Sequence, residues 1–167
     1  YNGSTWSEGG DLNTVRQTTG AGSSNSSALA VGGYDPSNVT DVVEQYNGTS
    51  WTEIAEINTA RYIINNTGTV TAMLGAGGQP HNASVESWDG SSWTEVAEFS
   101  TGRNESPVGA GTNTAAIIYG GQYPPGLNVR ANTESFDGTS WTELNDLNTA
   151  RGYMGGGGTQ TIALAYG

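Results

Sequence analysis

The sequence NGTSWTEIAEINTAR, residues 47–61, returns as DGTSWTELNDLNTAR at residues 137–151, with 10 of 15 positions identical. Two more divergent copies occupy residues 2–16 and 89–103. Each copy places a Trp ten residues before an Arg, and the Trp residues of successive copies are 45, 42 and 48 residues apart. A repeat of this length is typical of solenoids, propellers and other arrays, so the repeat predicts the fold class.

One unit of the repeat is predicted to contain four short antiparallel strands. Residues 115–119 form an apolar run that ends at Gly120-Gly121, as expected for a buried strand. Residues 133–136 predict the next strand, Asp137-Gly138 a type I′ hairpin turn, and residues 140–144 the returning strand. The glycine-rich residues 152–158 and the apolar residues 162–166 predict the first strand and the buried second strand of a further unit.

Four strands in a unit of this length are typical of one blade of a β-propeller. Neighbouring blades bury each other's faces, and only small side chains fit near the axis, so the glycine-rich strand is predicted to be innermost. The chain begins and ends inside a blade pattern. Two arrangements are therefore compatible with the sequence: four blades that close with a gap, or a segment of a larger ring. We favour the segment, or an assembly of such segments.

Several repeated features resemble the kelch repeat. A double glycine follows the apolar strand, an aromatic residue ends the third strand, and a Trp and a Thr-x-Arg motif follow. The first two features are seen at Gly32-Gly33, Gly77-Gly78 and Gly120-Gly121, and at Tyr46, Trp88 and Phe136. This resemblance covers residues 1–167 as one kelch-like domain or segment, with repeats beginning near residues 2, 47, 89 and 137. The amino-acid sequence of the repeat also resembles kelch-like arrays in bacterial and phage surface and virion proteins.

The composition excludes several classes of partner. The chain has 5 Lys and Arg against 16 Asp and Glu, a net charge of −11, so nucleic acid and anionic membranes would repel it. It has no apolar run long enough to insert into a membrane, and no cysteine for disulfide or thiolate chemistry. Neither a leader-like segment nor an initiator Met opens the sequence, which indicates a processed product or part of something longer.

The residues that recur in every repeat are interpreted as structural. The Trp residues are expected to pack between blades, and each Arg is expected to form a buried bridge to a Glu or to backbone carbonyls. The Trp series is Trp6, Trp51, Trp93 and Trp141, and the Arg series is Arg16, Arg61, Arg103 and Arg151. The Glu that recurs seven residues before a Trp is Glu44, Glu86 or Glu134.

The sequence offers little for catalysis, so no enzyme activity, metal or cofactor is predicted. His81 is the only histidine, and no Cys or second His stands at a ligand spacing. No Gly-x-Ser-x-Gly motif provides a nucleophile. Asp35 and Asp41 flank a loop without matching a known calcium-binding pattern.

Length varies mainly between the double glycine and the Glu, at residues 34–42, 79–84 and 122–132. These loops are expected on one rim of the propeller, where aromatic and amide side chains on a rigid scaffold form a recognition surface. Drift in tolerant loops is the alternative explanation. The candidate ligand-binding residues are Tyr34, Asp35, Asn38, His81, Asn82, Tyr123, Asn128 and Arg130.

These observations lead to three hypotheses from different classes. The first is a non-catalytic adhesion module of an extracellular or virion-surface protein, which binds cell-surface glycan or protein through the variable loops. The second is a structural component whose open ends join copies of the chain into rings or filaments. A propeller enzyme with a site on the axis is the least favoured.

Overall fold

The structure is a computed structural model, and it describes residues 1–62, 64–80, 83–103, 108–123 and 128–167. These residues form an all-β protein in which no helix is present, as the repeat predicts. Accordingly, the described ranges contain no helix of the length and apolarity needed to cross a membrane.

The strands form three four-stranded antiparallel sheets and two short ribbons. Sheet 1 consists of β1 (Gln17–Ser24), β2 (Ser27–Tyr34), β3 (Val39–Tyr46) and β4 (Trp51–Glu53). Sheet 2 consists of β5 (Asn65–Thr69), β6 (Ala72–Ala76), β7 (Val85–Trp88) and β8 (Trp93–Val96). Sheet 3 consists of β9 (Val108–Thr112), β10 (Ala115–Tyr119), β13 (Thr133–Phe136) and β14 (Trp141–Glu143). The ribbons are β11 (Gln122–Tyr123) with β12 (Asn128–Val129), and β15 (Gly155–Gly158) with β16 (Ala163–Tyr166).

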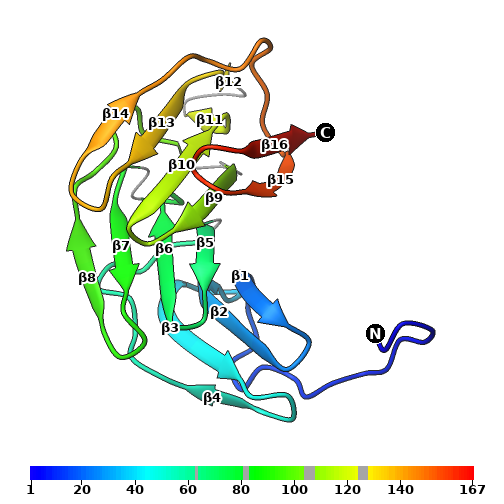
Figure 1. Cartoon of the computed structure of the whole chain (residues 1–167). Coiled ribbons are helices and arrows are strands. Elements are labelled where there is room, and N and C mark those ends of the chain that lie inside the picture. The colour runs from blue at the N-terminus through cyan, green and yellow to red at the C-terminus, as the bar shows by residue number, and fades with distance from the viewer. Residues whose placement is uncertain (63, 81–82, 104–107, 124–127) are drawn as a thin grey trace.

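The sheets follow one another along an arc, with their first strands on the inner side and their fourth strands on the outer side (Figure 1). The first strands of successive sheets contact one another, as do β9 and β15. A Cβ added to Gly109 would lie 3.0 Å from the side chain of Asn65 on the neighbouring strand. Small residues are therefore needed where the inner strands converge, as predicted. The described residues do not close the arc into a ring.

The same aromatic pair joins the third and fourth strands in each four-stranded sheet. The aromatic residue that ends the third strand lies opposite the Trp that begins the fourth strand, as in Tyr46 with Trp51. The ring centroids of these pairs lie 5.1, 5.3 and 4.9 Å apart in sheets 1, 2 and 3. The hydrophobic pattern of the repeat therefore specifies one register in all three sheets.

Two apolar clusters fill the junctions between neighbouring sheets. The first joins Leu29, Val31 and Val43 of sheet 1 to Met73, Trp88 and Trp93 of sheet 2, with Ile57 from the connector between the sheets. The second joins sheets 2 and 3 and includes Leu74, Ala76, Phe99, Ala116 and Phe136, with Trp141 packed against it. A sheet of this kind buries both faces only when it has a neighbour on each side.

The hairpins between third and fourth strands differ from the predicted type I′ turn. A type I′ turn has two central residues with positive φ, but in this hairpin only Gly138 has one, with φ of 95°, whereas Asp137 does not. Phe136 pairs directly with Trp141, so the loop has four residues. The Asp137 carboxylate accepts hydrogen bonds from the backbone N–H groups of Thr139 and Ser140, at 2.9 and 2.8 Å. The side chain at this position, not the backbone alone, stabilises the loop.

The corresponding loop of sheet 2 predicts a specific response to acid. Hydrogen bonds from the Ser92 backbone and from the side chain and backbone of Ser91 lower the pKa of Asp89 to about 2. A carboxylate with a lowered pKa stabilises the fold above the pKa of the unfolded chain, and this contribution is lost as pH falls through the folded value. We expect Asp89→Asn to keep the turn, because Asn47 accepts the same backbone hydrogen bonds in sheet 1.

The wild-type protein should therefore lose stability relative to Asp89→Asn between about pH 4 and pH 2. Urea unfolding of both proteins at several pH values measures this difference. A difference that stays constant from pH 6 to pH 2 would contradict the assignment.

The C-terminal apolar strand is not buried, in contrast to the prediction. Ile162 is 78% exposed, and Leu164 in β16 is 65% exposed. The reason is that β15 and β16 form a sheet of only two strands, which we call the C-terminal ribbon. At the other end, Trp6 is 84% exposed because the segment that contains it extends away from the sheets (Figure 1). The prediction that the whole Trp series packs between sheets is therefore wrong for Trp6. Trp51 also belongs to neither apolar cluster, and its indole N–H donates to the carbonyl of Gly10 at 2.9 Å.

Candidate functional site

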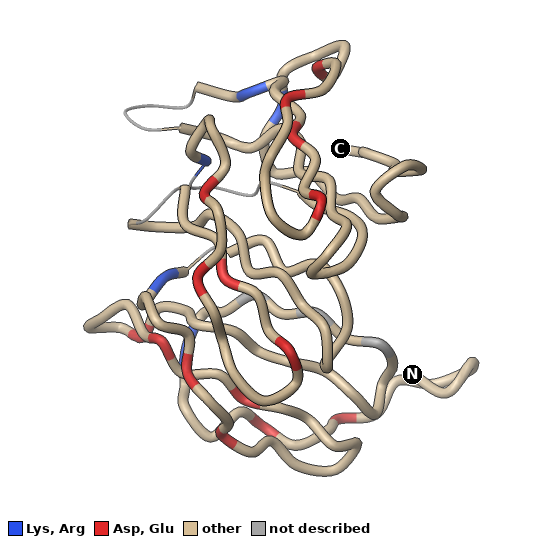
Figure 2. The backbone as a smooth tube through the Cα atoms, turned by 60° about the vertical axis from the view of Figure 1, so that its left-hand side comes forward, with Lys and Arg blue, Asp and Glu red and all other residues tan. Residues whose placement is uncertain are grey.

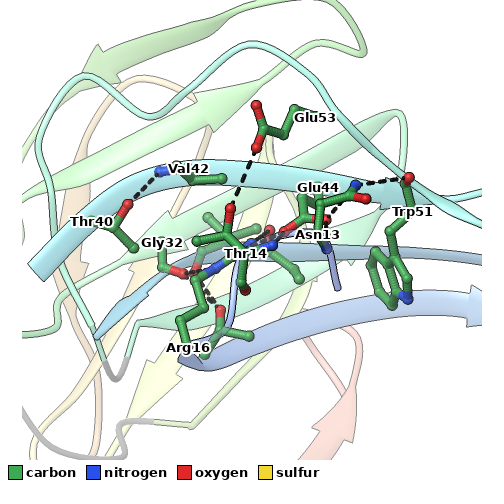
Figure 3. Close-up of polar contacts among 12 residues, drawn as sticks. Asn13, Thr14, Arg16, Gly32, Thr40, Val42, Glu44, Trp51 and Glu53 are labelled. Carbon is green, nitrogen blue, oxygen red and sulfur yellow. Dashed lines mark hydrogen bonds and ion pairs between the residues drawn. The ribbon is translucent and has the colours of Figure 1, made fainter. Parts of the chain in front are cut away.

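Each four-stranded sheet holds a buried glutamate in a recurring arrangement that we call a clasp. A clasp consists of an (Asn/Ser)-Thr-x-Arg segment before the first strand and a Glu on the third strand. In sheet 1, the Glu44 carboxylate accepts hydrogen bonds from Asn13 N and Nδ2, at 2.7 and 2.9 Å, and from Thr14 N at 3.2 Å (Figure 3). It also forms an ion pair with the Arg16 guanidinium. The clasp thereby ties the connector that enters a sheet to the third strand of that sheet.

The same contacts recur in the other two complete sheets. Glu86 binds Arg61 at 2.9 Å and the backbone N–H of Asn58 at 2.7 Å. Glu134 binds Arg103 at 2.7 Å, and there Ser100 replaces the Asn, donating from its N–H at 2.8 Å and its hydroxyl at 3.0 Å. The buried bridges predicted from the sequence are thus present, with Glu and carbonyl acceptors together.

The charges in the clasps shift one another's pKa values. Burial alone would raise the pKa of Glu44, but the Arg16 guanidinium and the N–H groups of Asn13 and Thr14 outweigh this effect and lower it. Burial lowers the pKa of Arg61 and Arg103, and their glutamate partners oppose that change. Both guanidinium groups stay charged, because arginine is not deprotonated in proteins.

The fourth Asn-Thr-x-Arg segment is residues 148–151. Arg151 is half-buried, and its guanidinium donates to the carbonyl of Gly167 at 3.1 Å. In the first clasp, Arg16 makes the matching bond to Gly32 at 2.9 Å in addition to its ion pair. Among the residues that the structure describes, no Asp or Glu side chain forms an ion pair with Arg151. The carbonyl bond of the clasp therefore recurs at Arg151.

The variable loops carry a separate group of candidate residues on sheets 1 and 2. Tyr34, at the end of β2, is 37% exposed and lies 5.5 Å from the ring of Tyr62. The Tyr62 hydroxyl donates to the Gln79 side chain at 2.7 Å. The sequence analysis did not name Tyr62 or Gln79 as binding residues: Tyr62 lies outside the variable loops, and Gln79 begins the loop of residues 79–84 without being among the candidates. An isolated antiparallel bridge outside the named strands pairs Tyr62 with Gln79.

Asp35 and Asn38 lie in the same loop as Tyr34. The Asp35 carboxylate accepts hydrogen bonds from the backbone N–H groups of Ser37 and Asn38, at 2.6 and 2.7 Å. Its acceptor capacity is thus partly used by the loop itself, which rigidifies the loop. Asn38 is exposed.

A second group of candidates lies on the ribbon of β11 and β12 beyond sheet 3. The Arg130 guanidinium lies 5.2 Å from the centre of the Tyr123 ring, within the range of a cation–π contact. Asn128 pairs with Tyr123 across the ribbon. The remaining two predicted residues, His81 and Asn82, lie outside the described residues.

The distribution of charge matches the acidic composition. Asp and Glu positions are spread over the outer strands and connectors, whereas the arginine positions lie toward one side of the molecule (Figure 2). No group of three or more His, Cys, Asp or Glu side chains that would suit a metal ion occurs in the described part of the chain. Comparison of the sequence with protein-family models and with curated proteins gives no match.

Proposed function

We propose that the chain is a kelch-like β-propeller, or a segment of one, that serves as a non-catalytic binding module. The observation that carries this proposal is the contrast between constant and variable parts of the repeat. Aromatic pairs and clasps recur in each complete sheet, whereas the loops after the second strand differ in length and composition. A rigid repeat scaffold with variable loops is a common basis of recognition.

The loops favour a partner that offers hydroxyl groups and apolar ring faces. Tyr34 and Tyr123 are each 37% exposed, and each has a side-chain neighbour that limits its motion. Such tyrosines stack on sugar rings and bind protein surfaces at low entropic cost. The net charge of −11 disfavours nucleic acid and anionic membranes. The proposed partner is therefore a cell-surface glycan or protein, and the resemblance to surface and virion repeat proteins suggests an extracellular or virion location.

The test is to replace both tyrosines by alanine and to measure attachment to cells and to a glycan panel. We expect Tyr34→Ala with Tyr123→Ala to weaken binding by roughly tenfold or more, the usual effect of removing aromatic contacts from an interface. Tyr1→Ala is the matched control, because Tyr1 is an exposed aromatic residue far from these loops in sequence. Attachment that is unchanged in the double variant, with the fold intact, would eliminate these loops as the contact.

A second candidate function is structural self-assembly. It is favoured by the C-terminal ribbon, which exposes Leu164 and Tyr166 where the complete sheets bury the corresponding Leu29 and Val31. Light scattering over a range of concentrations separates the two candidates, since a binding module with no self-association remains monomeric.

A further inference from the structure

The three variable loops of the rim differ in charge. Residues 34–42 contain two Asp and no basic residue, and residues 79–84 contain no Asp, Glu, Lys or Arg. Residues 122–132 contain one Arg, Arg130, and no acidic residue. In a chain with a net charge of −11, the loop of sheet 3 is therefore the one variable loop with a positive charge.

Arg130 is also the only basic residue outside the repeated motif. The chain has five Lys and Arg in total, and the other four are the arginines of the Thr-x-Arg motif. In the three complete sheets these arginines form ion pairs with the clasp glutamates. In the described part of the chain, Arg130 forms no ion pair. Its charge therefore does not serve the repeat.

The guanidinium of Arg130 is held against the exposed ring of Tyr123, 5.2 Å from its centre. The backbone of Arg130 is fixed on both sides, because its N–H donates to the Gly121 carbonyl at 2.8 Å and its carbonyl accepts from Arg151 N at 3.0 Å. Its Nε atom is buried without a hydrogen-bond acceptor among the described residues. The two Nη groups are therefore the donors that a ligand can reach.

The exposure of Tyr123 is a property of this rim. Tyr123 is 37% exposed, and Tyr34, in the variable loop of sheet 1, is exposed to the same extent. Sheet 1 has a complete neighbour in sheet 2, and the ring of Tyr62 lies 5.5 Å from that of Tyr34. A tyrosine on this rim thus stays accessible beside a complete sheet.

We propose that Tyr123 and Arg130 form a subsite for the carboxylate of an acidic sugar, a uronic or a sialic acid. This inference rests on the proposed function and assigns a chemical class to its glycan. The Nη groups of Arg130 donate to the carboxylate, and the exposed part of the Tyr123 ring packs on the apolar face of the sugar. A sugar carboxylate is attached directly to the ring, so one sugar unit reaches both side chains.

The charge of the chain favours such a sugar over an acidic protein surface. A net charge of −11 repels a partner that carries many negative charges, whether protein or polyanion. A single carboxylate among neutral sugars needs only one local cation, which Arg130 supplies in a loop without acidic residues. The subsite therefore selects an isolated acidic sugar.

The first test compares ligands that differ in the acidic group and uses the unmodified 167-residue protein. Methyl β-D-glucuronide and methyl β-D-glucoside share one ring and differ by a carboxylate in place of a hydroxymethyl group. The methyl glycoside of N-acetylneuraminic acid is the second acidic probe. In NMR titrations, at least one acidic sugar should bind about tenfold more tightly than the glucoside, and its identity shows which acid the site takes. If neither does, the inference is overturned.

The second test assigns this preference to Arg130. Arg130→Gln should reduce the preference for the acidic sugar to less than about twofold. Arg151→Gln is the matched control, because it changes the net charge equally and its guanidinium donates to the Gly167 carbonyl. We expect this control to keep the preference. Equal losses in the two variants would show that a general positive field attracts the ligand, and would contradict a site at Arg130.

Two further outcomes separate this inference from the proposed function. Tighter binding of N-acetylglutamate amide than of both acidic sugars, lost in Arg130→Gln, would assign the subsite to a protein partner and overturn the sugar assignment. If cell attachment depends on Tyr34 and Tyr123 but no acidic sugar is preferred, only the present inference fails. If attachment is unchanged when both tyrosines are replaced by alanine, the proposed function of these loops fails.

Discussion

Arg103→Ala should destabilise the protein by about 3–5 kcal/mol, because it leaves a buried carboxylate without its cation. Arg103 and Glu134 are both buried, and their side chains meet at 2.7 Å. The same guanidinium also donates to the carbonyls of Asn132 and Gly120, at 2.6 and 3.2 Å, and these acceptors would lose their donor. The midpoint of urea unfolding, followed by tryptophan fluorescence, measures the loss.

Arg151→Ala is the internal control for this prediction. It removes the same residue from the same repeat position, but Arg151 is half-buried and its guanidinium bond is to the carbonyl of Gly167. We expect a cost of about 1 kcal/mol or less, the usual value of one such hydrogen bond. Equal costs for the two variants would show that the carboxylate contributes nothing and that the arginine acts only by packing.

The features that the sequence predicted correctly are those that every repeat must share. The pattern occurs in four copies, and a residue type that recurs at one position in each copy indicates a shared structural role. The strands, the small inner residues and the buried Arg–Glu bridges were therefore predictable. The bridge is a clear case, since an Arg such as Arg61 and a Glu such as Glu86 recur in register and each is costly to bury alone.

The features that were missed depend on what lies beside a repeat unit. Residues 162–166 have the apolar pattern of a buried strand, yet Ile162, Leu164 and Tyr166 are exposed in the two-stranded C-terminal ribbon. The contact of Tyr34 with Tyr62 joins two neighbouring sheets through residues that do not recur. The hairpin turn was assigned from the Asp-Gly pair alone, whereas the Asp137 side chain stabilises a loop of four residues.

Trp93→Ala should also cost about 3–5 kcal/mol, the usual effect of removing a large aromatic side chain from a core. Trp93 is 7% exposed and packs with Trp88 in the cluster between sheets 1 and 2. Its removal opens a cavity in this junction, beside Leu29 of sheet 1 and Met73 of sheet 2, and protein cores are too closely packed to close such a gap without cost. Because sheets 1 and 2 meet through this cluster, we expect a single loss of stability in urea unfolding rather than a local change in the hairpin.

Trp6→Ala tests whether this cost comes from the junction or from the hairpin itself. Trp6 occupies the same repeat position and forms the same ring pair, with Tyr1, but it is 84% exposed and lies outside both apolar clusters. If burial between sheets produces the stability, this substitution should change the free energy of unfolding by no more than about 0.5 kcal/mol. If the aromatic pair stabilises its own hairpin independently of a neighbouring sheet, Trp6→Ala and Trp93→Ala should have similar costs. A large difference between these two values would therefore show that a unit of this repeat acquires its stability from the sheet beside it.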